Sequence, residues 1–501
     1  MPYLERLANA INLINAMAIS KLDGRFYTPK YLVNNILDFG GYSEKDILKK
    51  HVIDNSCGDG AFLAVIVERY CKVYFEFNYD KDELKAELEE YIHGIEIDSE
   101  ETNKCIANLN NVTQKHGIEN VKWDVLNEST LFVDKFNSKI DYVFGNPPYI
   151  RVHNLKESYD SVKKFQFSKG GMTDIYIVFF EIGFNMLNPN GKMCLITPSS
   201  WLHSNAGLEL RKHIAIKNNL IGLIDLEHYQ PFEATTYTLI SLFSKEENTN
   251  KVEYCVYDIE NKDRKHVANI NLSDLFINNN IYLATEDKLH EIKTIFNSIF
   301  TKKYVEVKNG FATLCDRVFI GKFDFKSKYI IDIIKASTNK WYECFYPYDE
   351  QGRPIPLETI QKDESLYSYL LENKEVLTNE RDIQNKDLWY LFGRTQALKD
   401  VHKSKIVVNT TLKNKESIKI SFVESGQGVY SGLYILTDVK FETIKKILVS
   451  DEFIGYVSML KKYKSGGYYT ISSKELELFL NYKLSLQYGQ QIISKSDNSL
   501  F

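Results

Sequence analysis

The sequence predicts an α/β fold whose first half is a doubly wound, Rossmann-like sheet. Five short apolar runs predict strands, at about 51–55, 91–97, 121–125, 141–145 and 192–197. Four stretches with helical patterns lie between and after them, at 61–75, 99–115, 174–187 and 206–217. Alternation of this kind is typical of a sheet that is covered by helices on both faces.

The rest of the chain predicts a hairpin and a second domain. Two further apolar runs, 220–226 and 238–243, leave almost no room for a crossover, so we expect the sheet to end in an antiparallel hairpin. At 501 residues the chain is too long for one ordinary core. We expect a catalytic domain over residues 1–285 and an α+β domain over residues 286–501.

A glycine loop follows the first predicted strand. The segment from Asn55 to Gly60 is a predicted turn, and a helix begins at Ala61, so Gly58 and Gly60 lie where the backbone approaches a ligand at a helix N-terminus. The loop lacks the third glycine of a dinucleotide site and the Lys-Ser/Thr pair of a P-loop. A ligand without phosphates is therefore favoured.

Two acidic residues are placed to bind such a ligand. Asp54 ends the first strand and suits an ammonium group, such as the amino group of S-adenosylmethionine. Glu96 comes at the end of the second strand, where an acidic residue of nucleotide folds accepts bonds from ribose hydroxyls. Both positions predict a cofactor site.

The run Asn146-Pro147-Pro148-Tyr149 follows a buried strand and predicts a stiff turn, because proline cannot donate to a strand ladder. The Asn146 side-chain oxygen and the Pro147 carbonyl could each accept an N–H from an exocyclic amine, which frees its delocalised lone pair for attack. Tyr149 could stack on the base. Such a run is often only a turn, but its position after a strand and downstream of the glycine loop favours a methyl-transfer site.

In their order along the chain, these motifs resemble the gamma class of DNA adenine-N6 methyltransferases, the Taq-like and Eco57-like enzymes of bacterial restriction-modification. The resemblance covers nearly the whole chain and implies S-adenosylmethionine as the cofactor. The cofactor contacts that it implies are Tyr27, Thr28, Pro29, Asp54, Cys57, Gly58, Gly60, Glu96, Ile97 and Asp124. The catalytic residues that it implies are Asn146, Pro147, Tyr149 and Phe232, with Tyr229 and Tyr237 as alternatives to Phe232.

Charge is distributed unevenly between the two halves. The formal charge is −10 for residues 1–300 and +5 for residues 301–501. The C-terminal segment from Val307 resembles the start of a target-recognition domain, so double-stranded DNA is the expected partner, and a basic module suits a polyanion. The lysines concentrated there are Lys399, Lys403, Lys405, Lys413, Lys415, Lys419, Lys461, Lys462 and Lys464.

Cysteine spacing and the length of apolar stretches exclude several classes of protein. The seven cysteines have no C-x-x-C spacing, so neither a zinc ribbon nor a disulfide framework is predicted, and no metal is expected. No signal segment and no apolar stretch of about 18 residues is found, so we expect a cytoplasmic, nucleoid-associated bacterial protein without membrane contact. We expect a monomer, and a separate restriction endonuclease is a further candidate partner.

Three alternative functions stay open. The side-chain amide nitrogen of glutamine also has a delocalised lone pair, so a methyltransferase that acts on a protein glutamine could use the same turn. Such chains, however, lack a second basic domain. The sequence hardly distinguishes an enzyme that methylates adenine in structured RNA from one that methylates adenine in DNA. A non-enzymatic DNA-binding specificity subunit is disfavoured by the intact Asn146, Tyr149, Gly58 and Gly60. The recognition sequence and the base-reading residues are not predictable.

Overall fold

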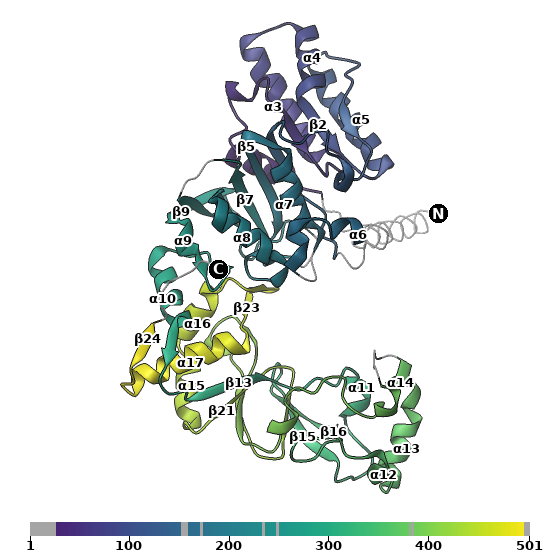
Figure 1. The fold of residues 1–501 in the computed structure, drawn as a ribbon, viewed down its shortest axis with the longest axis vertical. Coiled ribbons are helices and arrows are strands. Elements are labelled where there is room, and N and C mark those ends of the chain that lie inside the picture. Colours follow the sequence, from purple (N-terminus) through teal and green to yellow (C-terminus); the bar gives the residue numbers. More distant parts are fainter. Residues whose placement is uncertain are drawn as a thin grey trace. The chain divides into compact units, whose positions relative to one another are not determined.

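The computed structural model describes residues 27–151, 159–170, 174–232, 236–246, 250–379, 381 and 385–494. The chain divides between Leu289 and His290 into two compact units, called unit 1 and unit 2. Helix α10 (Glu286–Phe296) spans this division. Figure 1 shows unit 1 in purple to teal and unit 2 in green to yellow.

Unit 1 is built on a nine-stranded sheet with the strand order β3-β2-β1-β4-β5-β7-β6-β8-β9. The first five strands of this order run parallel, and β7 lies antiparallel between β5 and β6. The strands are β1 (Val52–Asp54), β2 (Ile92–Ile95), β3 (Asp124–Leu126), β4 (Ile140–Gly145), β5 (Leu187–Pro198), β6 (Leu220–Asp225), β7 (Thr238–Ser244), β8 (Lys251–Asp258) and β9 (Asp263–Asn271).

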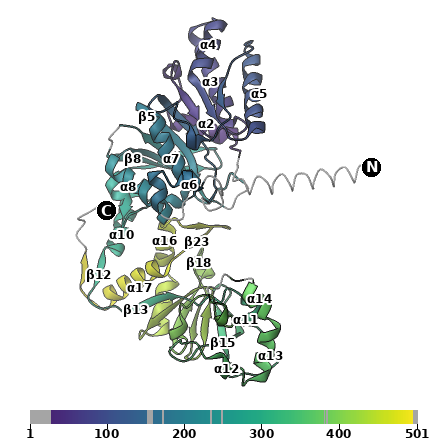
Figure 2. The same ribbon diagram turned by 45° about the vertical axis from the view of Figure 1, so that its right-hand side comes forward.

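Helices cover this sheet. Helix α3 packs against both α2 and α5, and α7 packs on β4 and β5. These four helices are labelled in Figure 2. The long helices of unit 1 are α2 (Lys30–Phe39), α3 (Ala61–Phe77), α4 (Lys81–Tyr91), α5 (Ser99–Lys115), α7 (Ile175–Met186) and α8 (Leu208–Lys217). Among the described residues, no helix is both long and apolar enough to cross a membrane.

The core of unit 1 explains why these segments form a layered sheet. Strand β1 and the second half of β4 are buried throughout, as expected for parallel strands with both faces covered. Leu32, Leu63, Phe144 and Ile196 belong to one apolar cluster that joins α2 and α3 to the sheet. This packing holds the carboxyl ends of the parallel strands at one edge.

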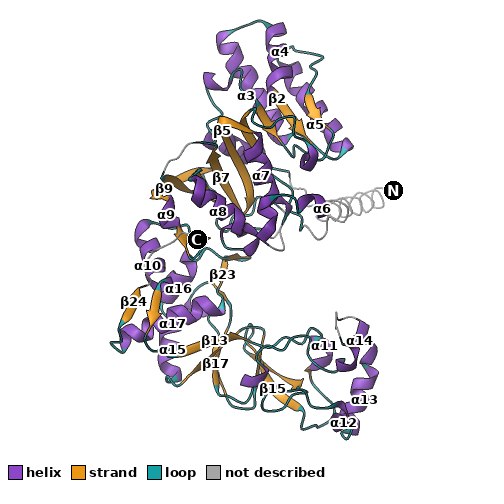
Figure 3. Ribbon diagram, viewed as in Figure 1, coloured by secondary structure: helices purple, strands orange, loops and turns teal. Residues whose placement is uncertain are grey.

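Unit 2 combines small sheets with short helices, shown in orange and purple in Figure 3. Two four-stranded sheets have the orders β13-β21-β17-β19 and β14-β16-β15-β20, and a three-stranded sheet has the order β18-β23-β22. The strands are β13 (Val305–Asn309), β14 (Ile320–Gly321), β15 (Ile330–Lys335), β16 (Lys340–Phe345), β17 (Lys405–Val408), β18 (Thr411–Leu412), β19 (Ile420–Val423), β20 (Gly428–Tyr430), β21 (Leu433–Thr437), β22 (Tyr463–Lys464) and β23 (Tyr468–Thr470). The main helices are α13 (Glu364–Glu372), α14 (Lys374–Asn379), α15 (Phe441–Leu448), α16 (Asp451–Met459) and α17 (Ser473–Gln487).

The predicted fold class is confirmed, and one detail is wrong. The doubly wound sheet, the antiparallel β6–β7 pair and an α+β second unit are all present. The sheet does not end at that pair, because β8 pairs in parallel with β6 and β9 follows as a further antiparallel edge strand. The domain boundary expected at residue 285 and the roles given to the two domains stay predictions.

Candidate active site

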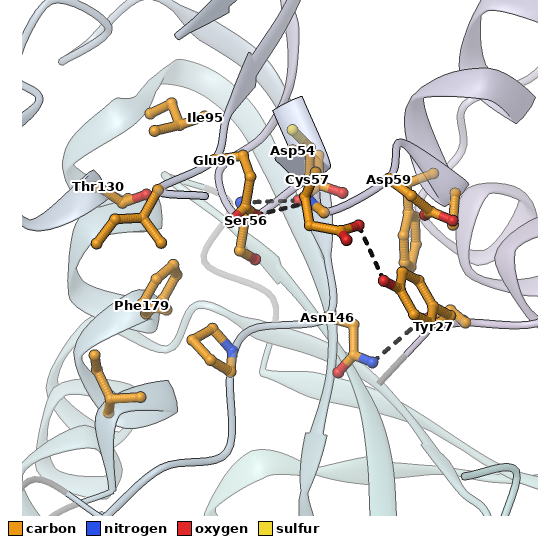
Figure 4. A pocket seen from close by; sticks show the side chains of 18 of the residues that line it. Tyr27, Asp54, Ser56, Cys57, Asp59, Ile95, Glu96, Thr130, Asn146 and Phe179 are labelled. Atoms are coloured by element: carbon orange, nitrogen blue, oxygen red, sulfur yellow. Dashed lines mark hydrogen bonds between the residues drawn. The ribbon is translucent and has the colours of Figure 1, made fainter. Parts of the chain in front are cut away.

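A cavity of about 260 Å³ lies at the carboxyl ends of β1, β2 and β4. Figure 4 shows the side chains that face it, from the glycine loop, the end of β2 and the turn after β4. The lining residues are Tyr27, Thr28, Asp54, Ser56, Cys57, Gly58, Asp59, Ala61, Phe62, Ile95, Glu96, Ile97, Glu101, Ser129, Thr130, Leu131, Asn146, Pro148, Ile150, Ile175 and Phe179. This edge is where ligands bind in open α/β sheets.

The glycine loop forms one wall of the cavity. Gly58 and Gly60 have φ values of 53° and 86°, in the left-handed region that favours glycine. A Cβ on Gly60 would lie 2.8 Å from Cys105 Sγ, so this position also lacks room for a side chain. The loop thereby brings its backbone to the cavity just before α3 begins at Ala61.

Two buried carboxylates line the cavity. Asp54 is only 1 % exposed, and its Oδ1 accepts from Ser56 N at 3.0 Å. Burial raises the pKa of Asp54 to about 7, the bond from Ser56 lowers it, and the charges of Glu96 and Asp59 raise it further. Glu96 accepts backbone N–H groups from Gly58 and Asp98, each at 2.9 Å.

These residues fit a ligand that carries positive charge. A buried carboxyl that ionises with difficulty gains most from a nearby cation, because the cation replaces the hydration that burial removed. Asp54, Glu96, Asp59 and Glu101 all line the cavity, and among the described residues neither Asp54 nor Glu96 forms an ion pair. The ammonium and sulfonium of S-adenosylmethionine match this charge.

The turn after β4 opens onto the same cavity. Asn146 donates through Nδ2 to Thr28 Oγ1 at 3.2 Å, and the Tyr149 hydroxyl donates to Asn146 Oδ1 at 2.5 Å. The same hydroxyl lies 3.3 Å from the carbonyl oxygen of Ile196 on β5. Burial raises the pKa of Tyr149 well above its ordinary value, so this phenol is a neutral donor.

Aromatic rings surround Tyr149. Its ring lies 6.4 Å from Phe232 and 6.2 Å from Tyr176, measured between centroids, and each pair is arranged edge to face. Tyr229 stacks instead on Tyr257 and shares a hydrogen bond with Tyr31. Of the three aromatic residues that the sequence proposed for this loop, Phe232 is the one whose ring packs against Tyr149.

One predicted cofactor residue lies elsewhere. Asp124 is the first residue of β3, so its side chain lies at the amino end of the strands and does not line the cavity. Its carboxylate accepts bonds from His93 Nδ1 at 2.8 Å and Lys135 Nζ at 2.6 Å. Asp124 therefore lies outside this cavity, at the start of a strand and not at its end as expected, and the cofactor contact that the resemblance implies for it stays a prediction.

The other predicted residues divide into two groups. The cavity brings together Tyr27, Thr28, Asp54, Cys57, Gly58, Glu96, Ile97 and Asn146. Pro29, Gly60, Pro147, Tyr149 and Phe232 do not line it, although all but Phe232 adjoin lining residues in sequence. Pro29 instead is the N-cap residue before α2, and its carbonyl accepts from Leu32 N and Val33 N. Their roles toward cofactor and base stay predictions.

Sequence reasoning missed several lining residues. Asp59 and Ser56 belong to the glycine loop itself and could have been found by their place in it. Glu101 lies in the first turn of α5, behind the Asp98 cap, and Tyr27 donates to its carboxylate at 2.9 Å. Thr130 and Phe179 reach the cavity from the segment after β3 and from α7, and no local pattern distinguishes them.

Most of the C-terminal lysines already have partners within unit 2. Lys405 is buried and donates to two backbone carbonyls, and burial lowers its pKa to about 8. Lys403 pairs with Asp400, Lys415 with Asp451 and Lys462 with Glu475. Lys399 and Lys464 are exposed. The lysine clusters therefore overstate the charge that is available to a ligand.

Comparison with known proteins agrees with the geometry. Residues 45–232 match the family model described as Eco57I restriction-modification methylase. This segment is similar to the methylase domain that the model describes. It contains the glycine loop, both buried carboxylates and the Asn146–Tyr149 turn.

Two curated relatives extend the similarity beyond this segment. The Type II methyltransferase M.BstVI of Geobacillus stearothermophilus is 22% identical over an alignment of 449 residues that covers 79% of each chain. The Type II restriction enzyme and methyltransferase RM.Eco57I of Escherichia coli is 23% identical, over 84% of this chain and 53% of its own length. The present chain thus spans about half of the latter.

A solved structure shares the fold. The Type IIL restriction-modification enzyme MmeI, determined in complex with DNA, superposes with a TM-score of 0.63 at 13% identity. The match covers 95% of this chain and 67% of that one. At this identity the likeness concerns the fold alone.

Proposed function

We propose that this protein is a site-specific DNA methyltransferase that transfers a methyl group from S-adenosylmethionine to N6 of an adenine in duplex DNA. The observation that carries the proposal is that the Asn146–Tyr149 turn and the carboxylates of Asp54 and Glu96 meet at one cavity. The Type II methyltransferases among its relatives support a role in bacterial restriction-modification.

Residues of the cavity and of the Asn146–Tyr149 turn would bind the cofactor and orient the substrate amine. Glu96 and Asp54 bind the cofactor, which when bound supplies a methyl group on a positively charged sulfur. Asn146 Oδ1 and the Pro147 carbonyl oxygen each accept a hydrogen bond from one N–H group of the amine. These two bonds direct the nitrogen lone pair toward that methyl group. The new N–C bond forms as the S–C bond breaks, and the extra proton then leaves the nitrogen to water.

A flipped base would be needed for this chemistry, because N6 cannot reach the cavity from within a stacked duplex. Tyr149 supplies a ring beside Asn146, and Phe232 supplies a second ring 6.4 Å from it. In the structure these rings pack edge to face, so a base that enters between them has to separate them. We propose that they then stack on the two faces of the adenine.

The decisive test is chemical. The protein is incubated with S-adenosylmethionine that carries a labelled methyl group and, in separate reactions, with duplex DNA, structured RNA and a protein substrate. The digested nucleosides and peptides are analysed by mass spectrometry. Labelled N6-methyladenine supports the proposal. Label that appears only in RNA, or only in a glutamine of a protein substrate, would select one of the alternative enzymes, and absence of transfer to all three would favour a binding subunit.

The role of unit 2 as the DNA-binding module is part of this proposal. MmeI was solved in complex with DNA, and the C-terminal half of this chain is the basic half. Charge reversal at Lys399 and Lys464, both exposed, should lower the salt dependence of DNA binding by roughly one unit of slope per phosphate contact. Lys462→Glu is not a suitable variant, because it would set a carboxylate against buried Glu475.

A further inference from the structure

The segment Tyr27-Thr28-Pro29 does more than line the cofactor cavity. Thr28 is buried and faces the cavity, yet its Oγ1 is also the acceptor for Asn146 Nδ2 at 3.2 Å. A single side chain thus touches both the cofactor cavity and the amide that accepts the substrate amine. This contact joins residues that are 118 positions apart in the sequence.

The chemistry of an amide makes this contact consequential. An asparagine side chain has an acceptor end and a donor end, and a half-turn about its last torsion exchanges them. The substrate amine needs an acceptor, so Oδ1 must face it. With the amide reversed, N–H groups would face N–H groups, and the lone pair of the amine would not be freed.

Two hydroxyl groups hold the amide from its opposite ends. Tyr149 donates to Oδ1 at 2.5 Å, whereas Thr28 holds Nδ2. The contact at Oδ1 is the one that an incoming amine has to share or displace. The contact at Nδ2 can persist throughout the reaction, and it can therefore keep the acceptor oxygen directed at the substrate.

We propose that Thr28 is a positioning residue that orients the Asn146 amide, in addition to its place in the cofactor cavity. This inference rests on the proposed function, because it assumes that Asn146 Oδ1 accepts an amine N–H. It makes the hydroxyl of Thr28, and not its methyl group, the part that matters for the rate of transfer. It also ties the N-terminal segment to the catalytic turn.

The test compares substitutions of buried threonines in unit 1. Thr28→Val keeps the shape and removes the hydroxyl, Thr28→Ser keeps the hydroxyl, and Thr113→Val is the matched control. Thr113 is also buried, but it does not line the cavity, and its hydroxyl donates to the Asn110 carbonyl within α5 at 3.2 Å. Single-turnover methyl transfer to duplex DNA is measured at saturating S-adenosylmethionine, with cofactor affinity from calorimetry and base flipping from 2-aminopurine fluorescence.

We expect Thr28→Val to slow transfer at saturation about tenfold, while flipping is unchanged. Thr28→Ser should recover the rate to within about threefold of wild type, and Thr113→Val should stay within about twofold of wild type. Thr28→Ala serves as a second hydroxyl deletion if Thr28→Val melts at a lower temperature than wild type.

Three results would overturn the inference while the wild type is active. One is a Thr28→Val rate equal to that of Thr113→Val, and another is a Thr28→Ser rate as low as that of Thr28→Val. A deficit that saturating cofactor removes would assign Thr28 to cofactor binding alone and also reject the inference. A wild-type protein that transfers no methyl group to DNA overturns the proposed function itself, so the two failures are distinguishable.

Discussion

Acidic residues at the two ends of the parallel strands in unit 1 have different kinds of hydrogen-bond donors. At the carboxyl ends, Asp54 and Glu96 accept bonds from the neutral backbone N–H groups of Ser56, Gly58 and Asp98. At the amino ends, Asp124 accepts from the side chains of His93 and Lys135. The carboxylates at both ends are hydrogen-bonded, but of these three only Asp124 has a lysine cation beside it.

The pKa directions follow from this difference. Burial raises the pKa of Asp54 to about 7. Burial also opposes ionisation of Asp124, but the bonds from His93 and Lys135 outweigh it and hold the pKa of Asp124 below its usual range. An acid without a cation partner at a cavity is a candidate ligand-binding group, whereas an acid that is already paired is a structural one.

The network at the amino ends is extensive. His51 Nδ1 lies 2.9 Å from His93 Nε2, and the two rings stack with their centroids 5.2 Å apart. Burial and the neighbouring His93 lower the pKa of His51. The chain His51–His93–Asp124 therefore joins the beginnings of β1, β2 and β3 without reaching the cavity.

The largest effect should come from the carboxyl end of β4. Asn146→Ala removes the acceptor for the substrate amine, and we expect the transfer rate to fall by about 10²–10³-fold, as for loss of a preorganised hydrogen-bonding group. Affinities for cofactor and DNA should stay nearly unchanged. A single-turnover assay measures this, and a rate above about a tenth of wild type would contradict the lone-pair argument.

A pair of isosteric substitutions tests the comparison directly. Glu96→Gln removes a charge at the cavity, and we expect it to weaken cofactor binding by about 1–3 kcal/mol. Asp124→Asn removes a charge at the other end of the strands and should leave that affinity unchanged. Calorimetry with S-adenosylmethionine measures both, and equal losses in the two variants would contradict the distinction between the two ends.

The free energy of unfolding should depend on pH in a way that reflects the burial of Asp54. Asp54 has its pKa raised from 3.8 to about 7 on folding, so the ligand-free protein binds more protons than the unfolded chain between these values. Its contribution to the free energy of unfolding is therefore lost as pH rises from about 4 to 7.

Asp54→Asn removes this loss. We expect the variant to be more stable than the ligand-free wild type at pH 8, by about 1–3 kcal/mol, and the gain to shrink toward pH 4. Cofactor binding should be weaker in the same variant. Urea unfolding at several pH values measures the effect, and a difference that does not vary with pH would argue against a buried, uncompensated Asp54.

The sequence could predict the elements of unit 1 because their signals are local. The predicted helix 99–115 coincides with α5 (Ser99–Lys115), and the turn at Asn146 follows β4 as expected. Asp124 was misplaced because its neighbours do not reveal where β3 begins. Glu101, Thr130 and Phe179 escaped notice because each enters the cavity through packing between distant segments, which no short pattern encodes.

The lysines of unit 2 illustrate the same limit. Clusters in the sequence suggested a DNA-binding face, but Lys405 is buried and Lys462 is paired with Glu475. Whether a lysine faces solvent depends on strands and helices that fold beside it. A cluster of charges in the sequence therefore predicts composition, and the fold decides which of those charges are available.

The smallest expected effect belongs to the amino ends of the strands. Asp124→Asn removes a partly buried ion pair, and we expect the free energy of unfolding at pH 7 to fall by about 1 kcal/mol. Because folding lowers the pKa of Asp124 below 3.8, its contribution is fully present above that value and is lost as pH falls through the lower, folded pKa. The difference from wild type should therefore be constant between pH 5 and pH 8 and should shrink only under more acidic conditions, which is the opposite trend to that of Asp54. Urea unfolding over this range, beside a calorimetric check that the variant binds S-adenosylmethionine normally, measures both expectations. A variant with unchanged stability and weakened cofactor binding would instead indicate that Asp124 contributes to cofactor binding.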